Sequence, residues 1–177
     1  EGDSTSTITN QINVSAYDGA KRAIIGNARV LKYTKGAAFI NSSNSTPLTQ
    51  NEIISGMNLD INEEYDVTAS GDYGGLVNAM TGGTIYAVAL SGKLSIGCSG
   101  TGAANNVGAI TSINNGLIDE CNSSVDIIYR AKAGGQVSGF ACIWKHNDYP
   151  LNSIDIRNSY STGQVSTYIN ANAYSFC

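Results

Sequence analysis

Acidic side chains are the first candidates for chemistry, because paired carboxylates are the groups that cleave glycosidic bonds. Neighbouring acids occur in the segment Glu63–Asp66 and at Asp119 and Glu120. Adjacent residues of a β-strand point to opposite faces, so Asp119 and Glu120 are not expected to act as one acid–base pair. His146 is the single histidine of the chain, and it belongs to no Ser–His–Asp set. We therefore expect no catalytic residue and no enzyme, with a polysaccharide-acting β-helix enzyme as the alternative.

Four cysteines, Cys98, Cys121, Cys142 and Cys177, are the second set of reactive groups. They contain no Cys-x-x-Cys pair, so the sequence lacks the paired knuckles of a structural zinc site. It also has no Asp-x-Asp-x-Asp-Gly calcium loop, and we expect no metal and no cofactor. An even number of cysteines in a chain rich in Ser, Thr and Asn favours two disulfides and an oxidising compartment. Free buried thiols are the alternative.

Aromatic residues in a polar stretch near the C-terminus form a candidate ligand surface. This stretch contains Trp144, His146 and Tyr149. An exposed aromatic ring offers an apolar face to a sugar, so these three are the predicted ligand-binding residues. The alternatives are that Trp144 packs beneath its own loop and that His146 is a solvated loop residue.

The composition predicts strands as the elements that position these residues. Ser, Thr and Asn fill 52 of the 177 positions, and 14% of the residues are charged. A helical bundle would need many more Leu, Glu and Lys, whereas Val, Ile and Tyr between polar turns suit short strands. The length suffices for one hydrophobic core.

Net charge and hydropathy argue against two classes of partner. The net charge of −4 disfavours nucleic acid, and no apolar run approaches the roughly 18 residues of a membrane-spanning helix. The sequence begins at Glu1 and shows no signal peptide. That is expected either after export or for part of a longer protein.

An internal repeat organises the second half of the chain. The segment from Gly74 to Leu94 has an echo from Val107 to Ile127, and a third copy runs from Ser138 to Val165. The anchors of the three copies are the glycines Gly75, Gly108 and Gly139, the isoleucines Ile85, Ile118 and Ile156, and the aliphatic residues Leu94, Ile127 and Val165. The third copy carries an insertion of seven residues, which we place around His146 to Asn152.

This repeat predicts a parallel β-solenoid of about three to four coils. Short strands cannot bury their apolar faces alone, but stacked coils share one core. The last ten residues begin a fourth coil, which would bring Cys177 within disulfide reach of Cys142. Cys98 and Cys121 would then be the second pair, although all three connectivities stay open.

The alignment also places charges side by side. Asp119 would lie beside Arg157 of the next coil, as expected for a solvated face. Glu120 aligns with Ala87 and Asn158 and would point inward if the strand were regular. We expect the strand to bend there, so that Glu120 reaches solvent, because a buried carboxylate needs hydrogen bonds.

The first sixty residues show no repeat and are predicted to form a separate region, with the solenoid over residues 61–177. Apolar residues between Ser15 and Leu31 follow helical spacing and predict an N-terminal α-helix of about four turns. A short second helix is expected after a cap at Thr49, with Glu52 at its third position. The long helix would either cap the open end of the solenoid or serve as a stem.

The repeat resembles a known family. GGLV, a turn rich in Asn and Gly, an isoleucine and NSYSTGQV (Asn158 to Val165) are similar to the GLUG repeat of bacterial surface proteins. ECNSSVDI (Glu120 to Ile127) matches less closely, with Ser124 where the motif usually has glycine. At the N-terminus, AKRAIIGNA (residues 20–28) resembles the C-terminal half of the long helix of type IV pilins.

These resemblances imply a function without catalysis. GLUG proteins are extracellular, often adhesin-like, right-handed β-solenoids, so we expect a bacterial surface domain for adhesion or surface assembly. Its partners would be surface glycans or proteins of a host or the environment, or other subunits of a surface filament. The pilin resemblance implies the alternative of a truncated pilin-like subunit that displays a β-solenoid domain on a pilus.

Overall fold

The computed structural model describes residues 7–9, 12–13, 22–26, 30–34, 38–41, 52–66, 71–80, 82–97, 104–114, 116–130, 136–144, 155–168 and 172–174. All regular elements in these ranges are β-strands, and no helix occurs among them. The strands form four sheets, here called A, B, C and D. The prediction of a mainly β protein is thus confirmed.

Sheet A holds the longest strands. It consists of β1 (Thr7–Ile8), β4 (Val30–Tyr33), β7 (Asn58–Asp66), β11 (Ala89–Gly97) and β15 (Asn122–Tyr129), followed by β19 (Tyr160–Ser161) and β20 (Val165–Thr167), which both pair with β15. Sheet B consists of β2 (Ile12–Asn13), β5 (Ile40–Asn41), β9 (Val77–Met80), β13 (Thr111–Asn114) and β17 (Ala141–Trp144).

The other two sheets are built from shorter strands. Sheet C consists of β3 (Arg22–Ile25), β6 (Glu52–Ser55), β10 (Thr84–Tyr86), β14 (Leu117–Asp119) and β18 (Asp155–Arg157). Sheet D consists of β8 (Gly71–Gly74), β12 (Ala104–Gly108), β16 (Gln136–Ser138) and β21 (Asn172–Tyr174).

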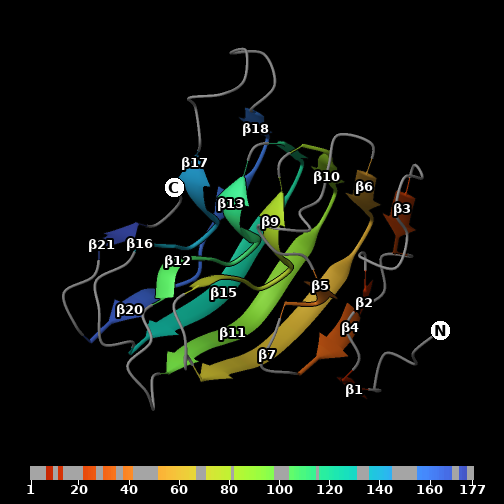
Figure 1. Ribbon diagram of the computed structural model, residues 1–177. Helices are drawn as coiled ribbons and strands as arrows, with labels where there is room; N and C mark the ends of the chain where they lie inside the picture. The colour runs from red at the N-terminus through yellow and green to blue at the C-terminus, as the bar shows by residue number, and fades with distance from the viewer. Residues whose placement is uncertain are drawn as a thin grey trace.

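The chain visits these sheets in a fixed order. From β8 onward it passes through sheets D, B, C and A, and then returns to sheet D at β12 and again at β16. All the strand pairs are parallel, for example β11 with β15 and β10 with β14. Figure 1 shows the result as a stack, in which β3, β6 and β10 of sheet C follow one another from red to green, and β7, β11 and β15 of sheet A lie side by side from gold to teal. Residues about one repeat apart in sequence therefore lie side by side.

Two anchors of the predicted repeat are confirmed by the strand register. Ile85 pairs with Ile118, which pairs with Ile156. The same isoleucine ladder continues upstream through Ile54 to Ile24, beyond the copies visible in the sequence. Leu94, Ile127 and Val165 form a second ladder in sheet A. The prediction of a fourth coil is also supported, because β21 pairs with β16.

The glycine anchors of the alignment were shifted by one residue. Gly108 pairs with Gly74 rather than Gly75, and Ser138 rather than Gly139 pairs with Gly108. The cause is an unequal corner between sheets B and C. Three residues separate Met80 from Thr84, and two separate Asn114 from Leu117. The sequence interval between paired residues of these two turns therefore changes at this corner.

The same register corrects the comparison with the GLUG motif and places the insertion. Because Ile127 pairs with Val165, the glycine of NSYSTGQV, Gly163, corresponds to Val125 and not to Ser124. Gly92 lies at this position in the preceding turn, where it pairs with Val125.

The insertion falls within residues 145–154, between β17 and β18, where the sequence predicted it.

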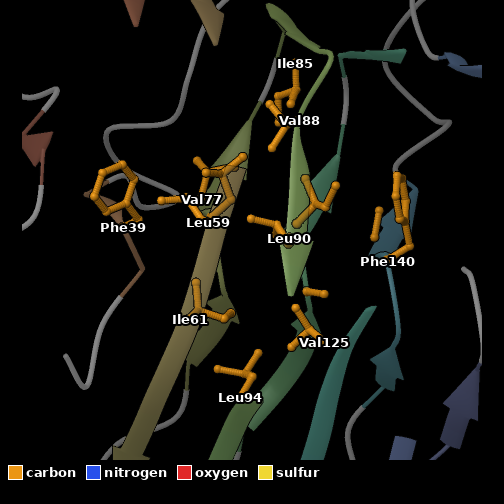
Figure 2. Packing of buried hydrophobic residues seen from close by; sticks show 14 of the residues in the cluster. Phe39, Leu59, Ile61, Val77, Ile85, Val88, Leu90, Leu94, Val125 and Phe140 are labelled. Atoms are coloured by element: carbon orange, nitrogen blue, oxygen red, sulfur yellow. The ribbon is translucent and has the colours of Figure 1, made fainter. Parts of the chain in front are cut away.

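The core lies between the four sheets and is built from inward-facing residues that alternate with outward-facing ones. In β7 the buried positions are Leu59, Ile61, Glu63 and Tyr65. Leu59 and Leu90 pair across β7 and β11, and Figure 2 shows them within the aliphatic group that includes Ile61 and Leu94. The Tyr65 hydroxyl donates a hydrogen bond to the carbonyl oxygen of Gly74 (3.0 Å), which ties sheet A to sheet D.

The predicted N-terminal helix is wrong wherever its residues are described. Arg22–Ile25 and Val30–Tyr33 are strands β3 and β4, which pair with β6 and β7. The residues 15–21 and 27–29 lie outside the described ranges. The helical spacing was misleading because the β-branched residues of this segment, Ile24, Ile25 and Val30, favour strands when a partner strand is present. This finding removes the helix from which the cap and the pilin-like stem were inferred.

Two further expectations for this region differ from the structure. Glu52, placed in the second helix, begins strand β6, whereas Thr49 lies outside the described residues. The boundary expected between residues 60 and 61 falls inside β7, which pairs with β4 on one side and β11 on the other. Strands on both sides of that boundary therefore belong to the same sheets.

Candidate functional site

The outer face of sheet C carries exposed apolar side chains. The isoleucine ladder from Ile24 to Ile156 occupies the inner face, so the alternate residues point to solvent. Among these, Ile25 is 73% exposed, Ile53 is 47% exposed and Tyr86 is 41% exposed. Exposing this much apolar surface is unfavourable, because each Å² left in contact with water forgoes about 25 cal/mol of burial free energy.

These side chains lie next to one another across neighbouring strands. Ile53 of β6 pairs with Ala23 and Thr84, so Ile25 and Tyr86 are each two residues further along the adjacent strand. Such diagonal neighbours are within reach of long and aromatic side chains. We call the row formed by Ile25, Ile53 and Tyr86 the apolar row.

Polar groups gather where sheet C turns toward sheet A. Asp119 pairs with Tyr86 on one side and with Arg157 on the other, as the alignment predicted. The Asn158 side-chain amide donates a hydrogen bond to Oδ1 of Asp119 (3.0 Å). Glu120 accepts a hydrogen bond from the Tyr86 hydroxyl, which raises the pKa of Tyr86. We call these five residues the corner cluster.

The backbone of this corner explains why Glu120 is exposed. Ala87, Glu120 and Asn158 have φ angles of 50°, 52° and 47°, and Gly56 has 64° at the same position one turn earlier. The N–H groups of Gly56, Ala87 and Glu120 donate to Tyr86, Asp119 and Arg157 of the next turn, at 3.1, 3.1 and 3.3 Å. The left-handed conformation breaks the alternation of the strand and turns Glu120 to solvent, as expected from the sequence.

Cys121 and Cys142 are buried, and neither forms a disulfide with another described residue. The Cys121 thiol donates to the carbonyl oxygen of Asp119 (3.2 Å), and that of Cys142 donates to Gln136 (3.0 Å). Burial raises the pKa of both thiols to about 11. Cys98 and Cys177 lie outside the described residues.

The strand register is incompatible with a Cys98–Cys121 disulfide. Cys121 precedes the first residue of β15, whereas Ile96, two residues before Cys98, pairs with Tyr129 at the other end of that strand. Eight strand residues span roughly 25 Å, and two peptide units recover less than ~8 Å of that distance. A disulfide needs Cα atoms within about 7 Å. The pairing of Cys142 with Cys177 stays a prediction.

The predicted ligand residues are not those that form the corner cluster. Trp144 is the last residue of β17, and His146 and Tyr149 lie outside the described residues. Sequence reasoning missed the apolar row because the repeat was not extended to β3 and β6. The isoleucines Ile24 and Ile54, spaced like their later counterparts, were the signal that could have revealed it.

The acidic residues are separated by the fold. Glu63 is buried and 1% exposed, while its neighbour Glu64 points to solvent. Within the described ranges, no group of three or more His, Cys, Asp or Glu side chains could hold a metal ion. No described helix is long and apolar enough to cross a membrane.

Comparison with known proteins gives no match: neither a family model, nor a curated protein, nor a solved structure matches the chain. The resemblance to the GLUG repeat therefore rests on the quoted residues alone and stays a prediction. The function must be argued from the surface itself.

Proposed function

We propose that this chain is a non-enzymatic domain of an extracellular bacterial surface protein, which binds surface glycans or proteins through the outer face of sheet C. The observation that carries the proposal is the apolar row directly beside the corner cluster. Its scaffold is a right-handed parallel β-solenoid, the fold that the repeat and the parallel sheets favour.

The chemistry of the face suits a ligand that is apolar on one side and polar at its edges. Tyr86 offers an aromatic ring that is 41% exposed, and aromatic rings combine a large apolar surface with a polar tip. Asp119, Glu120 and Asn158 supply carboxylate and amide groups within the same corner. A sugar ring has this combination, with C–H groups on its faces and hydroxyl groups around its edge.

The scaffold holds these groups in place. Tyr86, Asp119 and Arg157 belong to strands paired in register, and the adjoining corner is fixed by backbone hydrogen bonds from turn to turn. Binding residues on rigid elements lose little conformational freedom when a ligand binds. A stacked surface also repeats similar positions at each turn, which suits a polymeric partner.

A Tyr86→Ala variant tests the proposal in a glycan-array and cell-surface binding assay. We expect its binding to fall by at least about tenfold, as for an aromatic residue at the centre of an interface. Tyr168→Ala is the matched control, because Tyr168 is 66% exposed and contacts Arg130 on the far end of sheet A.

The same assay separates the two partner classes. Glycan binding that depends on Tyr86 supports the proposal, as does Tyr86-dependent binding to protease-sensitive cell-surface material. Equal binding by the Tyr86→Ala and Tyr168→Ala variants, or no binding by the unchanged protein to any surface, would contradict it.

A further inference from the structure

The strands around the Tyr86 ring carry negative charge and no positive charge on their outer face. Tyr86 lies on β10, which pairs with β6 on one side and β14 on the other, and the structure describes all three strands in full. Because residues alternate between the faces of a strand, their outward positions are Ile53, Ser55, Thr84, Tyr86, Leu117 and Asp119. The carboxylate of Asp119 is the only charged group among these six side chains.

A second carboxylate reaches the ring from the corner. Glu120 is turned to solvent by its φ angle of 52° and accepts a hydrogen bond from the Tyr86 hydroxyl. Asp119 pairs with Tyr86 on the neighbouring strand, and neighbouring strands are about 4.8 Å apart. The ring therefore has one carboxylate at its polar tip and another one strand away.

The basic group of the corner cluster lies beyond these acids. Arg157 belongs to β18, and Asp119 lies between it and Tyr86 in the strand register. Its single positive charge meets the two negative charges of Asp119 and Glu120, so the corner cluster is negative in total. The whole chain, with a net charge of −4, has the same sign.

This charge distribution discriminates between classes of glycan. A sugar carboxylate placed over Tyr86 would meet two like charges, which disfavours binding. An ammonium group would meet carboxylates that accept charge-assisted hydrogen bonds and an aromatic face that attracts cations. A carboxylate accepts several hydrogen bonds, so Glu120 can bind a ligand while it holds Tyr86, and Asp119 can do so while it holds Asn158.

We propose that the ligand of the outer face of sheet C is an amine-bearing glycan, whose sugar ring packs on Tyr86 and whose ammonium group donates to Glu120 and Asp119. The inference rests on the proposed function and names the class of glycan. A lysine-rich protein would also supply ammonium groups. Its lysines carry them on flexible stems, without a rigid ring that covers Tyr86 and the neighbouring Ile53 together.

Three oligosaccharides of equal length and linkage test this selectivity by isothermal titration calorimetry. They are the β-1,4-linked hexamers of glucosamine, N-acetylglucosamine and glucuronic acid. We expect the glucosamine hexamer to bind at least about tenfold more tightly than the N-acetylated one, and the glucuronic acid hexamer to bind most weakly. Raising the NaCl concentration from about 50 mM to about 500 mM should reduce the preference for the amine, because salt screens exposed charges.

Substitutions at Glu120 locate the selectivity. Glu120→Gln keeps an acceptor oxygen for the Tyr86 hydroxyl but removes the charge, so the preference for the amine should fall to about threefold or less. Glu120→Lys should reverse the order and favour the glucuronic acid hexamer. Glu64→Gln is the matched control, since it removes an exposed carboxylate near the opposite end of β7 from the corner, and it should keep the full preference.

The outcomes separate this inference from the proposed function. Equal affinity for the glucosamine and N-acetylglucosamine hexamers, lost in Tyr86→Ala, would overturn the inference and leave the proposed function standing. Binding of the glucosamine hexamer that Tyr86→Ala does not weaken would count against both. An unchanged preference in Glu120→Gln, no binding of any hexamer, or equally tight binding of a lysine homopolymer would each overturn the inference.

Discussion

The carbonyl oxygen of Ile61 in β7 occupies the place where a side chain on Gly92 in β11 would begin. Gly92 also has a φ of 100°, a conformation that residues with a Cβ atom rarely adopt. Gly163 is related in the same way to the carbonyl oxygen of Val125. Glycine thus allows neighbouring turns to approach each other in the middle of sheet A.

Replacing Gly92 by Ala should therefore be severely destabilising. Both the overlap with Ile61 and the positive φ oppose a Cβ atom, and we expect a loss of more than ~3 kcal/mol in the free energy of unfolding. Gly97→Ala is the control, because its Cβ would lie 3.5 Å from the nearest atom, the carbonyl oxygen of Tyr65. Urea denaturation of the two variants measures the difference, and equal losses would contradict the strand register.

The ladder of Leu94, Ile127 and Val165 gives a second prediction. Ile127 is fully buried, and truncation to Ala should cost about 2–5 kcal/mol through the cavity it leaves. Asp126 faces solvent, and its Oδ1 accepts a hydrogen bond from the Gln164 N–H (2.9 Å). Asp126→Ala should cost about 1 kcal/mol or less. Similar losses at both positions, measured by chemical denaturation, would refute the assignment of faces.

The parts of this fold that could be predicted are those in which one apolar residue recurs at a nearly constant interval. Ile85, Ile118 and Ile156 lie in equivalent strands and therefore reveal the stacking directly. The glycines were misaligned because the corner after Met80 is one residue longer than the corner after Asn114. The residue types at a corner do not reveal its length, so this difference could not be predicted from the sequence.

The N-terminal strands could not be predicted from local spacing. Ala23 and Ile24 fit a helical pattern, but they form a strand because Ile53 and Ile54 of β6 pair with them. A partner thirty residues away is invisible to a local pattern, and tertiary pairing overrides weak propensity. The apolar row was missed for the same reason, since two of its three members lie on β3 and β6.

The cysteines provide a third prediction. Cys121 follows Met57 and Val88 on an interior ladder, and the length of β15 separates it from the end of β11 that precedes Cys98, which is too far for a disulfide. We expect Cys121 to resist alkylation in the native protein, since burial raises its pKa to about 11. It should be fully alkylated in denaturant without reductant. Peptide mass spectrometry that finds Cys121 linked to Cys98 would show that the register of sheet A is wrong.

The last prediction concerns Glu63, which occupies an inward position beside Leu94 of the neighbouring strand. Neither of its carboxyl oxygens has a hydrogen-bond partner among the described residues. Burial raises the pKa of this carboxyl from 4.5 to about 10. The folded protein therefore keeps the proton at neutral pH, whereas the unfolded chain has lost it.

Unfolding must then release a proton between pH 4.5 and about 10. The contribution of the Glu63 carboxyl to the free energy of unfolding should be largest below pH 4.5. It should fall as the pH rises, by at most about 1.4 kcal/mol per pH unit. Glu63→Gln cannot ionise and should lose this slope in urea denaturation between about pH 5 and pH 9. Glu64→Gln, at the exposed neighbouring position, should keep it. The same pH slope in the Glu63→Gln variant and the unchanged protein would mean that Glu63 is not buried in its protonated form.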